Sequence, residues 1–141
     1  MLVRLLYVSR AVNPEDTKAT QSILDSAREH NLSNGITGIL CYGGGIYLQA
    51  IEGGRHQVNE LYGYIVRDQR HKDVALLHYE EITERRFGGW TMGQVDASRV
   101  NTNILLKYSE RAELDPYNVS GKVSLALLEE LMATASIIGR A

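Results

Sequence analysis

Apolar positions in the first half of the chain gather in three short runs, at residues 2–9, 36–42 and 46–51. Runs of this length, rich in Leu, Ile, Val and Tyr, are typical of buried β-strands. Three glycines at residues 43–45 separate the second run from the third. Because glycine adopts the positive φ that a tight reversal requires, these two runs are predicted to form a β-hairpin.

Gln49 does not suit the second strand of this hairpin. Alternate residues of a strand share a face, which groups Gln49 with Tyr47 and Ile51 and leaves Leu48 and Ala50 on the other face. Both sets are largely apolar, so both faces are expected to be covered and Gln49 to be buried. A buried amide without hydrogen-bond partners costs about 1–3 kcal/mol. Its partners must therefore come from elsewhere in the chain.

A helix is predicted between the first strand and the hairpin. Residues 13–16, Asn-Pro-Glu-Asp, are typical of a helix start, with Asn as N-cap, Pro at the first helical position and acids in the first turn. Ile23, Leu24 and Ala27 then share one apolar face. Asn31 continues that face where another apolar residue is expected.

A second helix is predicted after the hairpin. Its apolar stripe has members at i, i+3, i+4 and i+7 and continues into two polar residues. In order, these are Val58, Leu61, Tyr62, Ile65, Asp68 and Gln69. Residues 70–73 are predicted to be a polar break, residues 74–79 a fourth strand, and residues 80–81 and 84–86 a solvated turn. An aromatic segment flanked by glycines then leads into a fifth strand through Val95.

The predicted order is strand, helix, strand, strand, helix, strand, followed by one more strand. It predicts an α+β fold, the ferredoxin-like βαββαβ unit with an added fifth strand. Because crossovers are right-handed, both helices are expected on one face of the sheet. The tail is predicted to cover the other face with a short helix within residues 100–114 and a last helix. The apolar stripe of that last helix comprises Leu127, Leu128, Leu131, Ala135 and Ile138.

Composition narrows the class of protein. The chain has 141 residues, of which 44% are hydrophobic and 23% charged, as in an ordinary soluble domain. A net charge of −2 argues against a nucleic-acid partner. Cys41 is the one cysteine, which excludes an internal disulfide and favours a reducing compartment. Because neither a signal peptide nor a membrane-spanning apolar run is recognisable, a cytoplasmic protein is expected.

Three polar side chains are directed at the space between the sheet and the first two helices. Tyr7 comes from the first strand, Gln49 from the third and Asn31 from the end of the first helix. A phenol and two carboxamides around an apolar space are typical of a site for a planar, hydrogen-bonding ligand. A small buried network that satisfies its own hydrogen bonds would explain the same residues. The residues by themselves leave both interpretations open.

Motifs for conventional catalysis are missing from the sequence. The four histidines show no metal-ligand spacing with a cysteine or carboxylate, so no metal site is expected. Neither nucleotide-binding glycine fingerprint is present, and nothing resembles a nucleophile elbow. The residues leave open a ferredoxin-like enzyme or small-molecule-binding domain that uses this cleft, and a plain interaction module.

Six groups of residues, taken in order, identify a family that the chain resembles. They are Tyr7-Val8-Ser9, His30-Asn31, Thr37-Gly38, Tyr47-Leu48-Gln49 with Glu52-Gly53, Arg67-Asp68 with Arg70-His71, and Arg86-Phe87 with Gly89-Trp90-Thr91-Met92. With this order and spacing, roughly residues 1–95 resemble the BLUF domains, which are blue-light sensors using flavin.

The resemblance implies a non-covalently bound FAD whose ring lies between the first two helices. Tyr7 and Gln49 would be the photoactive pair. Trp90 and Met92 would form a switch segment beside Gln49, and either of them can be the inward residue. The residues expected to bind the cofactor are Ile23, Asn31, Gln49, Ile65, Asp68, Arg70 and His71.

A mechanism is implied as well. Photoexcitation of FAD would draw an electron and then a proton from Tyr7, and Gln49 would end rotated or tautomerised. A carboxamide suits this role because its donor end and acceptor end can be exchanged. The resulting state would absorb further to the red and revert in the dark. Ala27 stands where some relatives carry a serine, which is expected to alter the rate of that dark recovery.

The resemblance implies a sensor and not an enzyme. The expected organisation is a short, single-domain photoreceptor, with residues 1–96 as the sensor and residues 97–141 as a helical extension. That extension would cap the sheet or form a subunit interface. The signal would pass to a downstream protein partner, and the chain is expected to form a homo-oligomer, with neither a nucleic acid nor a membrane as partner.

Overall fold

Five strands form one sheet in the computed structural model, which describes residues 1–134. The strands are β1 (Leu2–Ala11), β2 (Thr37–Gly43), β3 (Ile46–Gly54), β4 (His71–Ile82) and β5 (Gly93–Asp96). Their order across the sheet is β4-β1-β3-β2-β5. Strand β5 runs parallel to β2, and every other neighbouring pair is antiparallel. The predicted ferredoxin-like sheet with a fifth strand is confirmed.

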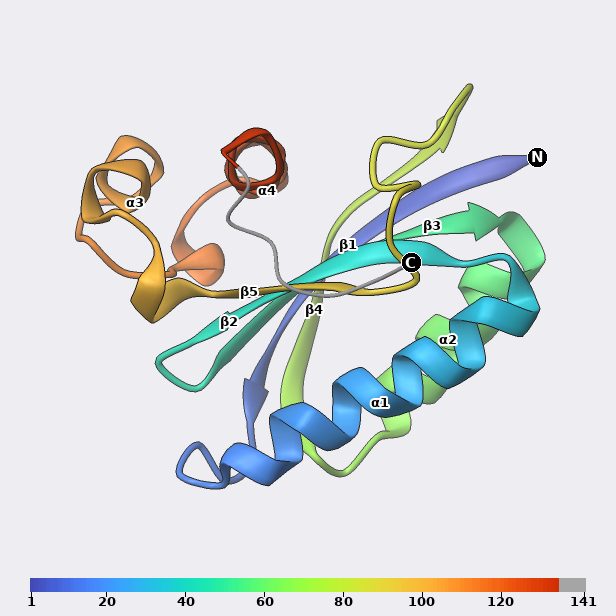
Figure 1. Ribbon diagram of the computed structural model, residues 1–141, viewed down its shortest axis with the longest axis horizontal. Coiled ribbons are helices and arrows are strands. Elements are labelled where there is room, and N and C mark those ends of the chain that lie inside the picture. The colour runs from blue at the N-terminus through green and yellow to red at the C-terminus, as the bar shows by residue number, and fades with distance from the viewer. Residues whose placement is uncertain (135–141) are drawn as a thin grey trace.

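Helices cover both faces of this sheet (Figure 1). Helices α1 (Thr17–Asn34) and α2 (Arg55–Arg67) lie together on one face. On the other lie α3 (Thr102–Tyr108) and α4 (Gly121–Ala133). The short 3-10 turn η1 (Ala97–Arg99) leads from β5 to α3, and η2 (Pro116–Asn118) lies between α3 and α4. This is the arrangement that the sequence predicts, and it leaves Gln49 only 3% exposed.

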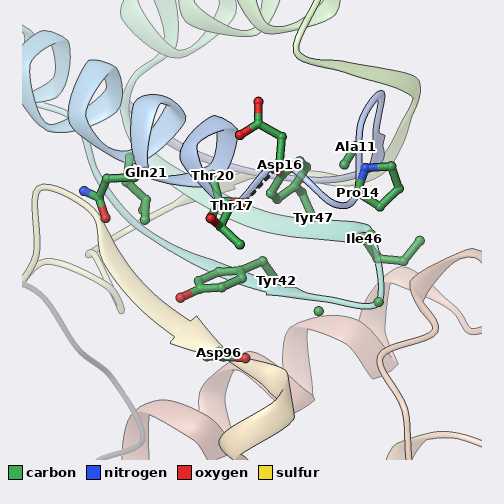
Figure 2. A pocket seen from close by; sticks show the side chains of 14 residues that line it. Ala11, Pro14, Asp16, Thr17, Thr20, Gln21, Tyr42, Ile46, Tyr47 and Asp96 are labelled. Carbon is green, nitrogen blue, oxygen red and sulfur yellow. Dashed lines mark hydrogen bonds between the residues drawn. The ribbon is translucent and has the colours of Figure 1, made fainter.

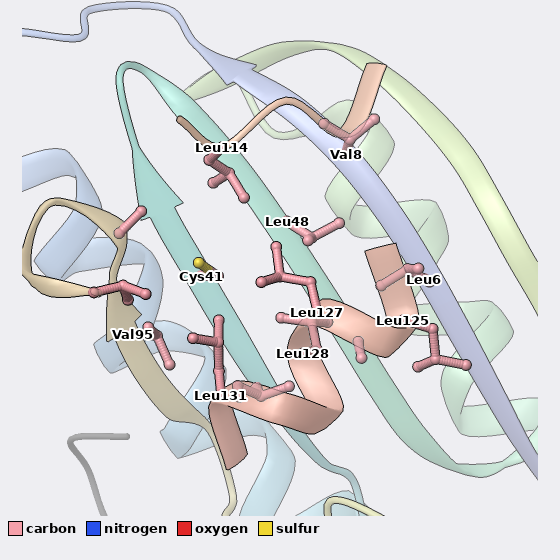
Figure 3. Close-up of a cluster of buried hydrophobic side chains, with 14 of the residues drawn as sticks. Leu6, Val8, Cys41, Leu48, Val95, Leu114, Leu125, Leu127, Leu128 and Leu131 are labelled. Atoms are coloured by element: carbon pink, nitrogen blue, oxygen red, sulfur yellow. The ribbon is translucent and has the colours of Figure 1, made fainter. Parts of the chain in front are cut away.

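Strand alternation divides the apolar residues into two cores. The core beneath α4, shown in Figure 3, includes Leu6, Val8, Cys41, Leu48, Val95, Leu114, Leu125, Leu127, Leu128 and Leu131. The core beneath α1 and α2 comprises Val3, Leu5, Tyr7, Ala11, Leu24, Ile36, Leu40, Tyr47, Ile51, Val58 and Met92. Successive residues of β1 and β3 therefore enter opposite cores, as the period of two requires.

Two glycines make the predicted hairpin turn possible. Gly44 and Gly45 have φ values of 58° and 77°, which only glycine adopts without strain. The turn between β2 and β3 is thus as short as the sequence predicts, and it fixes the register in which Leu40 lies opposite Gln49.

The first helix begins later than predicted, at Thr17. Its N-cap is Asp16, whose carboxylate accepts a hydrogen bond from the Lys18 N–H at 2.9 Å. Asn13, the predicted cap, instead accepts from the Asp16 N–H through its carbonyl, so residues 13–16 form a turn. An ionised carboxylate is favoured at a helix start by the helix dipole as well as by its acceptor strength.

Strand β4 is longer than predicted at both ends. It starts at His71, inside the predicted polar break, and runs through Glu80 and Glu81, which were predicted to lie in a solvated turn. The long strand β1 provides the pairing, which extends from Ala11 opposite His71 to Leu2 opposite Ile82. Local irregularities in this ladder, including the positive φ of 54° at Asp73, accommodate the polar residues.

The tail follows the predicted pattern with shorter helices. Helix α3 occupies only the middle of the predicted range, and α4 ends at Ala133. The stripe residues Leu127, Leu128 and Leu131 are buried, whereas Ala135 and Ile138 lie outside the described residues. Within residues 1–134, no helix has the length and apolar character that crossing a membrane requires.

Candidate functional site

Tyr7 and Gln49 face each other across β1 and β3, where they are directly paired in the register. Their exposed fractions are 2% and 3%. The Tyr7 hydroxyl donates a hydrogen bond to Gln49 Oε1, and Gln49 Nε2 donates to Met92 Sδ at 3.2 Å. Both ends of the amide are therefore engaged, the acceptor end with a phenol and the donor end with a thioether.

Met92 fixes the direction of this chain. A thioether sulfur can only accept, so Gln49 presents its NH₂ group to Met92 and its oxygen to Tyr7. Burial raises the pKa of Tyr7 far above its ordinary value, and the nearby Asp68 carboxylate raises this pKa further. The phenol therefore keeps its proton at neutral pH and can donate it to the Gln49 oxygen.

A cavity of about 200 Å³ lies between the sheet and helices α1 and α2. Helix α1 contributes the apolar side chains of Ile23 and Ala27, and α2 contributes Leu61 and Ile65. Polar groups lie at its floor and its edge. The remaining lining residues are Tyr7, Ser26, His30, Gln49, Tyr64, Asp68, Arg70 and His71. Apolar walls with a few convergent polar groups are typical of a small-molecule site.

An ion pair forms one edge of the cavity. Arg70 Nε donates to Asp68 Oδ1 at 3.0 Å, and Arg70 Nη1 donates to Ser22 Oγ of α1 at 2.9 Å. Burial tends to raise the pKa of Asp68, but the hydrogen bonds from Arg70 outweigh it and lower this pKa. Asp68 is therefore ionised at neutral pH, and Arg70 connects the end of α2 to α1.

Both ring nitrogens of His71 have hydrogen-bond partners. Its Nε2 lies 2.7 Å from the carbonyl oxygen of Ile65, which can only accept, so Nε2 donates. Nδ1 lies 2.8 Å from the Ser9 hydroxyl. Both ring nitrogens are occupied, which makes His71 a rigid part of the cavity wall.

Asn31 has one satisfied end and one unsatisfied end. The side chain is fully buried, and its Nδ2 donates to the Thr91 carbonyl at 2.7 Å. Its Oδ1 is buried without a hydrogen-bond partner among the described residues. An unpaired buried acceptor costs about 1–3 kcal/mol, so its position calls for a donor from a bound molecule. Asn31 is not itself among the residues that line the cavity; it lies one helical turn beyond Ala27, which is.

Met92 and Trp90 lie on opposite sides of the sheet. Met92 is fully buried in the core beneath α1 and α2, in contact with Gln49. Trp90 is half-buried and packs against the core beneath α4. The sequence left open which of the two is the inward residue, and the structure places Met92 there.

A buried ion pair on the opposite face of the sheet from the cavity was not predicted from the sequence. Glu52 is fully buried and accepts from Arg4 Nε at 2.8 Å, from the Arg86 N–H at 3.0 Å and from the Phe87 N–H at 2.7 Å. Residues 84–86 are therefore anchored to β3 and are not simply a solvated turn. The available clue was that Arg4 and Glu52 carry opposite charges on the same sheet face of two apolar strands.

A second cleft of about 330 Å³ lies near the start of α1, beside the β2–β3 turn and the end of β5 (Figure 2). Polar side chains surround it, including Asp16, Thr20, Gln21, Tyr42 and Asp96. It contains none of the residues predicted to bind the cofactor or to act in the photoswitch. The cavity between α1 and α2 is therefore the candidate site, although it is the smaller of the two.

Comparison with protein families gives one match over most of the chain. The family described as sensors of blue-light using FAD, BLUF, matches residues 2–93. Photoactivated adenylate cyclase subunit alpha of Euglena gracilis is 39% identical over 87 residues, which are 62% of this chain and 8% of that protein. The chain spans only 8% to 12% of the length of the first curated relatives that it matches.

Two solved structures are similar over nearly the whole chain. The photo-activated state of BlsA has a TM-score of 0.80 and 33% identity, with 94% of this chain and 95% of that chain covered. The dark state of BlrB, a BLUF protein, has a TM-score of 0.78 and 34% identity, with 95% and 96% covered. The similarity therefore includes the C-terminal helices as well as the region that matches the family.

Proposed function

The chain belongs to the BLUF family, the sensors of blue-light using FAD, and on that basis we propose that Tyr7, Gln49 and Met92 form its light-driven switch. The observation that carries the proposal is the chain of hydrogen bonds from Tyr7 to Gln49 to Met92. Tyr7 and Gln49 line the cavity, whereas Met92 belongs to the segment that leads into β5. A change in the cavity can thus reach the edge of the sheet through one amide.

The cavity suits a flavin in two respects: Ile23 and Ile65 provide apolar walls from facing helices, and Arg70 provides charged donors at the edge. One helical turn beyond the lining residue Ala27, Asn31 Oδ1 is a buried acceptor without a partner among the described residues. Bound there, FAD supplies absorption of blue light and an excited state that oxidises a neighbouring phenol. The residues that we propose to hold it are Ile23, Asn31, Gln49, Ile65, Asp68, Arg70 and His71.

Tyr7 would act as the donor of an electron and a proton. Its raised pKa keeps the proton on the phenol until the electron leaves, and Gln49 Oε1 is the acceptor already in place for that proton. Deep burial also keeps water from competing for the proton, because Tyr7 is only 2% exposed. The carboxamide of Gln49 is then the group that rearranges.

Rotation of Gln49 would break both of its present contacts. A rotated side chain presents Oε1 to Met92 Sδ, and two acceptors cannot form a hydrogen bond. It also presents its NH₂ group to Tyr7, which must then accept instead of donating. Met92 would lose its partner in the core, and the segment leading into β5 would be released. This is the step that we propose carries the signal out of the cavity.

The output is proposed to be a protein contact, with the chain itself a sensor that performs no catalysis. The relative in Euglena gracilis is named a photoactivated adenylate cyclase subunit, which supports transfer of a light signal to an effector. We also propose a cytoplasmic location. We propose in addition that the chain forms a homo-oligomer, because the apolar side chains of Leu76 and Leu106 are exposed and could form a subunit contact. Light scattering in the dark and under blue light tests the oligomer.

The direct test of the proposed function is reconstitution with FAD. The purified protein is expected to bind FAD and to show a flavin absorption band that shifts to the red under blue light and reverts in the dark. Free FAD in the same buffer provides the control, since it lacks the amide that shifts the band. A protein that remains colourless after incubation with FAD, or one whose bound flavin shows no reversible shift, contradicts the proposal.

A further inference from the structure

Three successive backbone carbonyls of residues 90–92, here called the switch segment, accept hydrogen bonds from outside the segment. The first accepts from the backbone N–H of Gly38 in β2 at 3.0 Å. The second accepts from Asn31 Nδ2 at 2.7 Å, and the third from Arg28 Nε at 3.2 Å. Helix α1 therefore holds two of the three carbonyls through side chains.

Arg28 differs from the other two donors. The Gly38 bond belongs to the backbone of the sheet, and Asn31 is already assigned to the cofactor. Arg28 is half-buried, lies outside the residues that line the cavity, and makes a second contact through Nη2 with Gln94 Oε1 at 3.0 Å. One guanidinium thus connects α1 to residues on both sides of Gly93, where β5 begins.

The contact with Gln49 is too weak to position Met92 alone. A thioether sulfur is a weak acceptor, and a methionine side chain has several rotatable bonds. The position of the sulfur therefore depends on where the backbone of Met92 is held. Arg28 supplies a charged donor to that backbone carbonyl, and hydrogen bonds from charged donors are roughly twice as strong as neutral ones.

We propose that Arg28 is a positioning residue that keeps Met92 against Gln49 and thereby sets the rate of dark recovery. This inference rests on the proposed function. Return to the resting arrangement requires Met92 Sδ to meet the donor end of Gln49 again. With Arg28 in place, the backbone of Met92 stays close to that position. Without Arg28, the switch segment would sample a wider set of conformations and would return to that position more slowly.

Gln94, the second partner of Arg28, lies next to the second cleft. Gln94 Nε2 lies 3.5 Å from the Tyr42 hydroxyl, and Tyr42 lines the cleft shown in Figure 2. Arg28 and Gln94 therefore connect the backbone of Met92 with that polar surface. A shift of the switch segment would alter this surface as well as the cavity.

The test compares Arg28→Met with Arg28→Lys and with Lys18→Met. Methionine keeps the apolar stem of the side chain and removes every donor, whereas lysine keeps one charged donor. Lys18 is an exposed cation on the same helix and serves as the matched control. In the FAD-loaded protein, Arg28→Met is expected to keep the size of the red shift and to slow dark recovery about threefold or more. Arg28→Lys should recover faster than Arg28→Met, and Lys18→Met should match the wild type.

Quenching of tryptophan fluorescence by iodide gives a second measurement in the dark. Trp90 is the one tryptophan of the chain, and it lies in the switch segment. Arg28→Met is expected to make Trp90 more accessible to iodide, and Lys18→Met is not. Wild-type recovery in Arg28→Met overturns the inference, whatever the quenching shows.

Failure of the proposed function has a different outcome. A wild-type protein without any red shift refutes the photoswitch. The quenching of Trp90 in the dark does not depend on the photoswitch, so it still tests whether Arg28 holds the switch segment. If Arg28→Met does not fold, Gln94→Ala removes the second anchor of the guanidinium. That variant should slow recovery in the same direction by a smaller factor, and unchanged recovery in it counts against the inference.

Discussion

Replacing Glu52 by glutamine is expected to destabilise the protein strongly. Glu52 is fully buried and accepts four hydrogen bonds or ion-pair contacts: two from Arg4, at 2.8 Å and 2.6 Å, and one each from the N–H groups of Arg86 and Phe87. Glutamine has nearly the same shape but no charge, and one of its two acceptor positions becomes an NH₂ group that faces donors.

The magnitude follows from what the substitution leaves behind. Arg4 is 2% exposed, and its other acidic partner among the described residues is Glu80 at 3.4 Å. Breaking a buried ion pair by removing one charge costs about 3–5 kcal/mol. Because domains are stable by about 5–15 kcal/mol in total, Glu52→Gln should forfeit a large fraction of the free energy of unfolding.

Urea unfolding followed by circular dichroism measures this loss. The matched control is Glu81→Gln. Glu81 forms an ion pair with Arg55 at the surface, where the two side chains are 58% and 48% exposed. A surface pair of this kind contributes about 1 kcal/mol or less. Glu52→Gln is expected to lose at least about 3 kcal/mol. A loss below about 1 kcal/mol, equal to that of the control, would show that the buried ion pair contributes no more than a surface pair.

Three further predictions concern the site. A Cβ added to Gly38 would lie 2.2 Å from the Ala50 carbonyl oxygen, so Gly38→Ala should cost about 1–3 kcal/mol in urea unfolding, whereas Gly89→Ala, with nothing within 4 Å, should cost almost nothing. Because the pKa of Tyr7 is raised in the folded protein, the phenol ionises first in the unfolded chain. The free energy of unfolding should therefore keep its full value below pH 10 and decrease at higher pH. By pH 11 the wild type should have lost about 1.4 kcal/mol more than Tyr7→Phe, and parallel pH profiles would count against the buried phenol. Asn31→Ala should weaken FAD binding about tenfold in a fluorescence titration, and undiminished affinity would remove Asn31 from the site.

Much of the fold follows from local patterns in the sequence. Alternation in β1 and β3 assigns Leu48 to one core and Tyr47 to the other, and the helical stripes orient α1, α2 and α4 correctly. The glycines of the hairpin determine its turn without reference to the rest of the chain. These features were predictable because each is decided by neighbours within a few residues.

The features that the sequence did not reveal depend on distant partners. Two good N-caps lie in residues 13–16, and only the structure shows that Asp16 is the one used. Strand β4 includes polar residues because the long strand β1 offers them backbone pairing, which their side chains do not indicate. The buried pair of Arg4 and Glu52 required knowledge of which strands are neighbours.

The candidate site was predicted in part from polar residues that occupy positions on otherwise apolar faces. Tyr7, Gln49 and Asn31 were identified because each is polar on an apolar face, and all three are buried. The same reasoning could not choose between Trp90 and Met92, since both are large and apolar. That choice depends on how β5 meets β2, which brings Met92 into the core with Gln49.

If light acts through the hydrogen bond from Tyr7 to Gln49, Tyr7→Phe must abolish the response. The control is Tyr62→Phe, because the Tyr62 ring lies 6.0 Å from that of Tyr7 and is not part of the hydrogen-bond chain. The measurement is the flavin absorption spectrum of each FAD-loaded variant before and after blue light. The account predicts that both variants bind FAD and that only Tyr7→Phe loses the reversible red shift. A normal red shift and dark reversal in Tyr7→Phe would contradict it.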